Sequence, residues 1–237
     1  MTKVLIAVPA HNEEKILRDN VLAIFNFCEK NLNFDWQIVI ADNSSTDQTS
    51  EIGQDLAQKY PGRVTYFFVD KKGKGLAIKS AWQNFSSDIY CFMDADLATD
   101  LSGLPNLISK IQAGNDLALG NRFDSHSRVK RSVARRIFSR LYHLFLKYYL
   151  RVKINDAPCG FKAINQKVKT ELLPQVKNED WFFDSELAIL AEKKAYLVAE
   201  VPIVWYDQRA RQDKSRVKII SLGFNYFKEV IKLKKRL

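Results

Sequence analysis

Two aspartates, Asp94 and Asp96, directly follow the apolar segment 89–93 (IYCFM). A short apolar run of this kind predicts a buried strand. Open α/β sheets bind ligands beyond the carboxyl ends of their strands, and side chains at i and i+2 of an extended segment point the same way. Both carboxylates are therefore suited to one hard cation, Mg²⁺ or Mn²⁺, that shares its shell with substrate phosphates. The alternative is a solvated acidic turn.

Polar residues also follow the other strands predicted in the first half of the chain, at residues 3–8, 37–41, 64–69 and 116–119. These polar residues are Asn12, Glu13, Asp42, Lys74 and Arg122. Helix capping or turn formation explains several of them equally well. The KGKG segment, moreover, lacks the trailing Lys-Ser/Thr of a P-loop. Their common position after strands predicts a single binding edge.

Helix patterns fill the segments between these strands. Apolar residues recur at helical spacing over residues 13–30, over a segment that ends at about residue 59, and over residues 76–85 and 101–113. Strand, loop and helix alternate through about residue 120. This alternation predicts an α/β fold in which a mostly parallel sheet carries helices on both faces.

The second half changes character and predicts basic amphipathic helices. Residues 132–152 have a wide apolar and aromatic face beside a basic face, and the segment from residue 217 onward repeats this pattern. Such helices suit an anionic membrane surface. The alternative is a core helix with a solvated basic stripe. Between these two helical segments, the sequence predicts a structured loop at 155–164, a helix at 181–194 and a strand at 197–205.

The net charge of +10 over 237 residues is unevenly distributed. Residues 128–155 hold nine Lys/Arg and no acidic residue, and residues 208–237 hold ten Lys/Arg and two acidic residues. The rest of the chain is therefore acidic. A basic patch on an acidic body predicts an anionic partner, such as phosphates, nucleic acid or an anionic membrane.

The cysteines and the hydropathy bear on localisation. Three cysteines, widely spaced and odd in number, favour a reducing compartment and argue against a disulfide framework or a zinc site. No apolar run approaches the roughly 18–20 residues that a membrane-spanning helix needs. We therefore expect a cytoplasmic protein that associates peripherally with the membrane.

Seven segments, in their order along the chain, resemble those of family 2 glycosyltransferases with the GT-A (Rossmann-like) fold. The resemblance is closest to the polyprenyl-phosphate (dolichol-phosphate) mannosyl- and glucosyltransferases and covers nearly the whole chain. The segments are VPAHNEE (8–14), ADNSSTDQT (41–49), KGKGLAIKSA (72–81), MDADL (93–97), GNRF (120–123), DAPCGFKAI (156–164) and WFFDSEL (181–187).

This resemblance implies an inverting transfer of a sugar from a nucleotide-sugar to a polyprenyl phosphate, with Mg²⁺ or Mn²⁺ as cofactor. It implies a single GT-A catalytic domain over residues 1–237. Residues 1–122 would form the nucleotide-sugar-binding half, and residues 123–237 the acceptor-side and membrane-facing half. The CGFK form of the 156–164 segment is similar to the glucosyl branch and favours a UDP-sugar, with GDP-mannose as the other option.

The resemblance also implies roles for individual residues. Those on the donor side would be Pro9, Ala10, Asn12 and Glu13 at the nucleoside, Asp42 at the base, Lys74 at the nucleotide, and Asp94, Ala95 and Asp96 at the diphosphate, with Asp94 and Asp96 holding the metal. Those at the acceptor phosphate would be Arg122, Arg135, Ser139 and Arg216, bordered by Asp156. The catalytic set would then be Asp94, Asp96, Arg122 and Asp156.

Some positions depart from the family pattern. Asn43 stands where many relatives have a second Asp, and Asn121 replaces the usual Ser before the arginine. The loop at residues 206–216 lacks the family's common Gly before its Ser.

Two other functions remain open at this stage. A related transferase could use a hydroxyl acceptor, which requires a carboxylate base. Asp156, Asp184 or Glu186 would then supply it, whereas a phosphate acceptor is already ionised. A nucleic-acid-binding protein would also explain the basic segments, although the sequence contains no recognition motif for nucleic acid.

Overall fold

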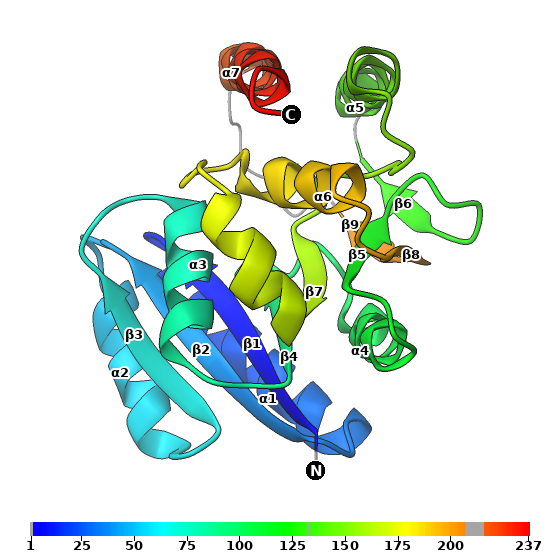
Figure 1. Ribbon diagram of the computed structural model, residues 1–237. Coiled ribbons are helices and arrows are strands. Elements are labelled where there is room, and N and C mark those ends of the chain that lie inside the picture. Colours follow the sequence, from blue (N-terminus) through cyan, green and yellow to red (C-terminus); the bar gives the residue numbers. More distant parts are fainter. Residues whose placement is uncertain (1, 132, 207–215) are drawn as a thin grey trace.

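The computed structural model describes residues 2–131, 133–206 and 216–237, with side chains left out at residues 134, 135 and 216–224. A seven-stranded sheet forms its centre, in the order β3-β2-β1-β4-β7-β5-β8 (Figure 1). Its strands are β1 (Lys3–Ala10), β2 (Asp35–Asn43), β3 (Val64–Val69), β4 (Ile89–Met93), β5 (Leu117–Asn121), β7 (Phe161–Asn165) and β8 (Val198–Pro202). A second sheet pairs β6 (Arg128–Lys130) with β9 (Val204–Tyr206).

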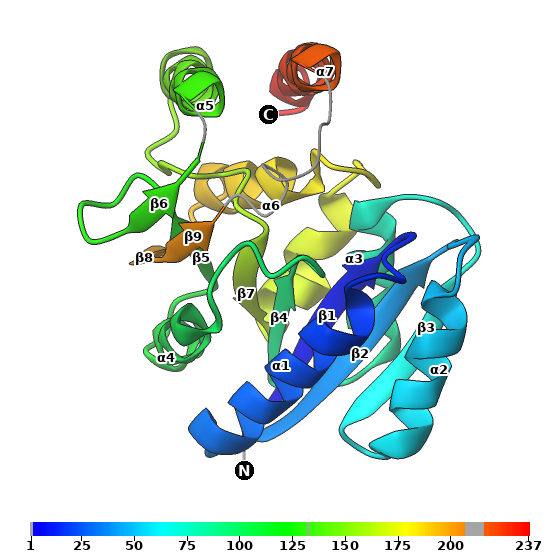
Figure 2. The ribbon, with the colours of Figure 1, turned by 180° about the vertical axis from the view of Figure 1, so that it is seen from behind.

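Helices cover both faces of the large sheet, as the alternating pattern predicts (Figures 1 and 2). The α-helices are α1 (Leu17–Asn31), α2 (Thr49–Lys59), α3 (Lys74–Asn84), α4 (Leu104–Gln112), α5 (Val133–Phe145), α6 (Phe183–Lys193) and α7 (Arg216–Lys234). The shorter turns are η1 (Leu101–Gly103) and η4 (Leu173–Gln175), both 3₁₀, and η2 (Leu146–Leu150) and η3 (Val168–Leu172), both π-helical.

The sheet divides the hydrophobic core into two layers. Alternate residues of β1 point to opposite faces, so that Leu5 and Ala7 join one cluster while Val4 and Ile6 join the other. Helices α1, α2 and α4 pack on the second face, and α3 and α6 pack on the first. Burial on both sides explains why these strands are almost continuously apolar.

Strand β7 runs against the direction of its neighbours. It pairs antiparallel with both β4 and β5, whereas the other strand pairs in this sheet are parallel. Its first residue, Phe161, lies opposite Met93, the last residue of β4. The loop that precedes β7 is therefore brought to the carboxyl end of β4, beside Asp94.

The predicted elements differ from the observed ones mainly at their ends. The helix expected from residue 13 begins at Leu17, after a turn in which the Leu17 N–H donates to the Glu13 carbonyl (2.9 Å). The backbone N–H of Glu13 donates to Thr49 Oγ1 and so ties this turn to α2. The single strand expected over 197–205 divides at Ile203 into β8 and β9, which belong to different sheets. The helix expected over 132–152 ends with η2, where Arg151 adopts a left-handed conformation (φ 54°).

Helices α5 and α7 pack against each other on the same side of the molecule as α6 (Figures 1 and 2). Phe227 of α7 contacts Phe138 and Phe145 of α5, with ring centroids 6.3 and 4.7 Å apart. The side chains Val133, Ile137, Leu141, Leu144 and Tyr148 remain exposed. The described part of the chain holds no helix long and apolar enough to cross a bilayer.

Candidate active site at the carboxyl ends of the strands

The two aspartates after β4 lie beside a buried lysine from the start of α3. The Nζ atom of Lys74 is 2.6 Å from Asp94 Oδ1 and 2.8 Å from Asp184 Oδ2, which comes from the first turn of α6. Asp96 Oδ1 accepts a hydrogen bond from the backbone N–H of Ala98 (3.1 Å). Lys74 thus joins Asp94, one of the two predicted metal-binding carboxylates, to Asp184, which lies 110 residues after the lysine.

The charge of Lys74 is stabilised by these contacts. Burial alone would lower the pKa of its ammonium group, but Asp184 and Asp94 together raise that pKa above its ordinary value. Lys74 is therefore a cation at neutral pH.

Gly160 lets the loop before β7 approach Asp94 closely. A Cβ atom at this position would lie less than 3.0 Å from Asp94 Oδ2. Only glycine can place its backbone so near the carboxylate without displacing it. The sequence predicts a structured loop at 155–164 but does not predict the close approach of Gly160 to Asp94.

Arg122 and Asp156, both predicted site residues, form a bidentate ion pair. Arg122 Nε and Nη2 donate to Asp156 Oδ2 and Oδ1 at 2.8 and 2.7 Å, and the Arg122 backbone N–H also donates to Oδ2 (2.8 Å). Burial favours a higher pKa for the Asp156 carboxyl, but Arg122 holds the pKa below its usual value. The pair fixes the loop after β5 against the loop before β7.

Two further charged residues, the buried Lys162 and the half-buried Glu200, hold the 155–160 loop in place. Lys162 Nζ donates to the carbonyl oxygens of Ala157 (2.9 Å) and Cys159. The carboxylate of Glu200 accepts from the backbone N–H groups of Asn155 (2.9 Å) and Asp156 (3.2 Å), and from the Asn155 side-chain amide (2.6 Å). These contacts are made mainly to backbone groups, so the two residues position the loop.

The predicted nucleoside-binding residues lie where β1 and β2 end side by side. In the parallel register, Pro9 pairs with Ala41 and Ala10 with Asp42. Asn12 Oδ1 accepts from the backbone N–H of Thr46 (2.8 Å), which joins the loops after the two strands. These loops therefore form one surface, as their common position after strands predicts.

Asp42 is fully buried at this surface. Its carboxylate accepts from the Ser45 backbone N–H (3.0 Å) and from the hydroxyl of Tyr66 (2.7 Å). The next residue, Asn43, accepts from the Gly73 backbone N–H (2.6 Å) and so links β2 to the loop that carries Lys74. Asp42 does not cap a helix, since the N-cap of α2 is Gln48, but one of its bonds closes a turn.

A basic cluster extends from Arg122 toward α5. Arg131 lies over the ring of Phe123 (5.3 Å), and its Nε is buried with no hydrogen-bond partner among the described residues. Burial lowers the pKa of Arg131, and the nearby charges of Arg122, Arg136 and Arg140 lower it further. Sequence reasoning missed Arg131, which no motif singles out.

Other predicted acceptor-side residues are placed less fully. Ser139 Oγ donates to the carbonyl of Arg136 (3.1 Å), one turn earlier in α5. The side chains of Arg135 and Arg216 lie outside the described residues, although both positions belong to helices. The loop at 207–215 lies outside them altogether.

The donor atoms present fit a metal that the substrate helps to bind. Within residues 2–131, 133–206 and 225–237, no group of three or more His, Cys, Asp or Glu could hold a metal alone. Residues 95 and 96 lie in a turn, closed by the bond from the Leu97 backbone N–H to the Asp94 carbonyl (3.1 Å), so the extended backbone expected at Asp94–Asp96 is not observed. Two carboxylates this close in sequence nevertheless suit Mg²⁺ or Mn²⁺, which complete their shells with phosphate oxygens and water. Asp94 and Asp96 would be its ligands.

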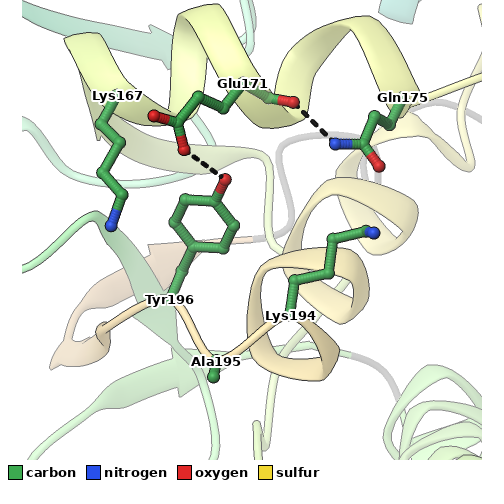
Figure 3. Close-up of a pocket in the computed structure, with 6 residues that line it drawn as sticks. All are labelled: Lys167, Glu171, Gln175, Lys194, Ala195 and Tyr196. Carbon is green, nitrogen blue, oxygen red and sulfur yellow. Dashed lines mark hydrogen bonds between the residues drawn. The ribbon is translucent and has the colours of Figure 1, made fainter.

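A shallow cavity of about 540 Å³ lies at the opposite end of the sheet, beyond β7 and α6 (Figure 3). It contains none of the predicted site residues. Its lining residues are Lys167, Glu171, Gln175, Lys194, Ala195 and Tyr196. The hydroxyl of Tyr196 donates to Glu171 (3.1 Å) and Lys167 lies over the Tyr196 ring, so several of the lining residues contact one another.

Comparison with known proteins decides the family. Residues 5–173 match the family model described as glycosyl transferase family 2. The chain belongs to glycosyl transferase family 2. The strand-end carboxylates, the glycine-rich turn at Lys74 and the 156–164 loop all fall within this matched region, so the family resemblance of these segments is confirmed.

Individual relatives of this family 2 protein carry related names. It is 30% identical over 246 residues to a dolichyl-phosphate beta-glucosyltransferase of Dictyostelium discoideum, covering 98% of this chain and 73% of the relative. It is 30% identical over 205 residues to the glycosyltransferase AglD of Haloferax volcanii, covering 86% of this chain but only 33% of that protein. The chain thus spans a third of one relative and about three quarters of the other.

A solved structure confirms the predicted GT-A fold. Glucosyl-3-phosphoglycerate synthase from Mycobacterium tuberculosis, in complex with Mn²⁺, UDP and glucosyl-3-phosphoglycerate, superimposes with a TM-score of 0.74 at 15% identity. The match covers 98% of this chain and 80% of that one. At this identity the likeness concerns the fold.

Proposed function

We propose that this family 2 glycosyltransferase moves a sugar, with inversion, from a nucleotide-sugar to a polyprenyl phosphate at a membrane surface. The family membership supports sugar transfer, and the relatives named dolichyl-phosphate beta-glucosyltransferase support the lipid acceptor. Those names and the CGFK segment favour a UDP-sugar as donor.

One observation carries the choice of acceptor: each of the three carboxylates named above as candidate bases is paired with a cation. Asp156 is paired with Arg122, and Asp184 with Lys74. Glu186 accepts from the backbone N–H groups of Lys177 and Asn178 and pairs with Arg236. A hydroxyl acceptor needs a base, whereas a phosphate acceptor is already ionised and needs alignment.

The basic cluster offers that alignment. Arg122 and Arg131 carry planar guanidinium groups, which suit phosphate oxygens. The Nε of Arg131, which has no hydrogen-bond partner among the described residues, is a donor available to a phosphate oxygen. We assign both side chains, with Arg135, Ser139 and Arg216 of the family pattern, to the acceptor phosphate.

On the donor side, Lys74, Asp94 and Asp96 would surround the diphosphate, with Ala95 between the two carboxylates. Asp42 would contact the base, and Pro9, Ala10, Asn12 and Glu13 would line the nucleoside pocket. A bound Mg²⁺ or Mn²⁺ would supply charge stabilisation to the diphosphate leaving group. Lys74 adds a fixed positive charge to the same region, and Asp156 keeps Arg122 oriented toward the acceptor.

The exposed face of α5 supports a peripheral membrane position. Its apolar side chains, from Val133 to Tyr148, lie at helical spacing beside the exposed Arg136, Arg140 and Lys147. An apolar stripe bordered by cations suits the boundary between anionic headgroups and acyl chains. The three cysteines are buried and unpaired, which agrees with the cytoplasmic side.

Two measurements test this function. Thermal unfolding with UDP, GDP and their sugar conjugates, each with and without Mn²⁺, should give a metal-dependent rise in melting temperature for one base. Transfer should then occur to a polyprenyl phosphate and not to the matching polyprenol. Transfer to the alcohol would favour a hydroxyl acceptor instead. Salt-sensitive binding to DNA or RNA, without any nucleotide-sugar binding, would favour the nucleic-acid function.

A further inference from the structure

Lys74 lies between the carboxylate of Asp94, a candidate metal ligand, and that of Asp184. It is 7% exposed, and its Nζ contacts both Asp94 and Asp184 within 2.8 Å. The rings of Phe92 and Trp181 lie 5.6 and 5.2 Å from the same nitrogen. The ammonium group is thus enclosed by two acids and two aromatic rings.

Asp94 already shares one of its oxygens with a cation. Its Oδ1 is held by Lys74, its Oδ2 lies against Gly160 with no room even for a methyl group, and 33% of its side chain is exposed. A divalent cation at Asp94 would repel the ammonium at short range. We therefore expect Asp94 to bind a metal more strongly once Lys74 has moved away from it.

Asp184 offers Lys74 a partner when it moves. Its Oδ2 already accepts from Nζ, and its Oδ1 is buried with no hydrogen-bond partner among the described residues. A shift of the ammonium from Asp94 toward Asp184 would satisfy that oxygen. Such a shift keeps the lysine charge inside the site, close to where the diphosphate binds.

We propose that Lys74 couples metal binding to nucleotide binding. In the free protein its ammonium group occupies Asp94 Oδ1. A bound nucleotide diphosphate draws the ammonium away, so that this oxygen becomes available to the cation. Asp184 is the positioning residue that retains Lys74 throughout. The inference rests on the proposed function, because it requires a diphosphate donor. Coupling between two ligands is reciprocal, so the cation must strengthen nucleotide binding by the same factor.

The test measures Mn²⁺ affinity by electron paramagnetic resonance, in which free Mn²⁺ is counted directly, with and without UDP. UDP should strengthen Mn²⁺ binding to the wild-type protein at least about tenfold, within the usual range of coupling between sites. Lys74→Met should strengthen Mn²⁺ binding in the absence of UDP and shrink the gain that UDP produces. Lys72→Met, which removes an exposed charge from the same loop, is the matched control and should change neither value.

Asp184→Asn should have the opposite effect. Lys74 would then have Asp94 as its only carboxylate partner, so Mn²⁺ without UDP should bind more weakly than to the wild type. This variant keeps the proposal falsifiable if Lys74→Met fails to fold. Nucleotide binding with equal Mn²⁺ affinity in wild type, Lys74→Met and Asp184→Asn would overturn the coupling and leave the proposed function intact. Absence of binding by any nucleotide would overturn both.

Discussion

The side chains of Arg122 and Asp156 form a bidentate ion pair across two loops, with both N–O distances at or below 2.8 Å. Asp156 is completely buried, and Arg122 is exposed over only 15% of its side chain. The pair therefore has a structural role as well as the catalytic one that the family resemblance implies, and the two roles can be separated by experiment.

Removal of Arg122 should destabilise the protein as well as inactivate it. Arg122→Ala leaves the Asp156 carboxylate buried without its partner, and loss of one member of such a pair costs about 3–5 kcal/mol. Urea unfolding monitored by circular dichroism measures this loss. The double variant Arg122→Ala/Asp156→Ala should recover much of the stability but no activity. Unchanged stability in the single variant would contradict the stabilising role of this buried ion pair.

The same pair should make stability depend on pH at the acid end. Arg122 holds the pKa of Asp156 below its ordinary value of 3.8, so the unfolded chain takes up this proton first. The contribution of Asp156 is present above about pH 4 and is lost as the pH falls through the lower, folded-state pKa. Unfolding free energies between pH 7 and pH 3 should fall more steeply for the wild type than for Asp156→Asn. Parallel curves would refute this role.

Gly160→Ala should disable the site at Asp94. The added Cβ would collide with Asp94 Oδ2, and overpacking of this kind costs roughly 1–3 kcal/mol. We expect a folded protein with weakened Mn²⁺–UDP binding and lower turnover. Isothermal calorimetry, performed at a temperature where the variant is folded, measures the binding. Wild-type affinity would show that Asp94 tolerates the displacement or takes no part in binding.

Arg131→Met should raise the KM for the polyprenyl phosphate. The loss of a hydrogen bond to a charged group costs roughly 1.5–3 kcal/mol, which corresponds to about a 10- to 100-fold effect. Nucleotide binding should not change, because Arg131 belongs to the acceptor-side cluster. Lys130→Met, at the adjacent exposed position of β6, is the control. Equal KM values for the two variants would remove Arg131 from the acceptor site.

Leu141→Glu should weaken binding to vesicles that contain anionic lipid. Leu141 is 56% exposed on the apolar stripe of α5, where an added carboxylate would enter the headgroup region. Leu197→Glu provides a matched control, because Leu197 is 61% exposed but precedes β8 at the opposite end of the sheet. Sedimentation with vesicles at low and high salt measures the difference. If vesicle binding by the wild type and by Leu141→Glu does not depend on lipid charge, membrane docking is contradicted.

The parts of the fold that sequence predicts best are those whose pattern is local. The apolar segment before Asp94 and the helix before residue 59 carry their own periodicity, and their positions are confirmed. The reversed direction of β7 has no local signal, because it depends on pairing with β4 and β5, whose residues are distant in the chain.

The same distinction between local patterns and long-range pairing explains which features of the candidate site the sequence predicts. Asp94, Lys74 and Arg122 are recognisable because each follows a predicted strand. The contact of Lys74 with Asp184 spans 110 residues, and that of Arg122 with Asp156 spans 34, so composition and spacing could name the members but not the pairs. The close approach of Gly160 to Asp94 likewise depends on the register of β7 against β4.

The reversed strand β7 has a consequence for how this enzyme can vary. One short peptide carries Asp156, which holds Arg122, and Gly160, which abuts Asp94. The length of that peptide therefore sets the span between Arg122 and Asp94. An insertion or deletion between Asp156 and Gly160 would alter this span while leaving both layers of the core intact. Loop length at this point is thus a geometric constraint on the candidate site, separate from the identity of any side chain.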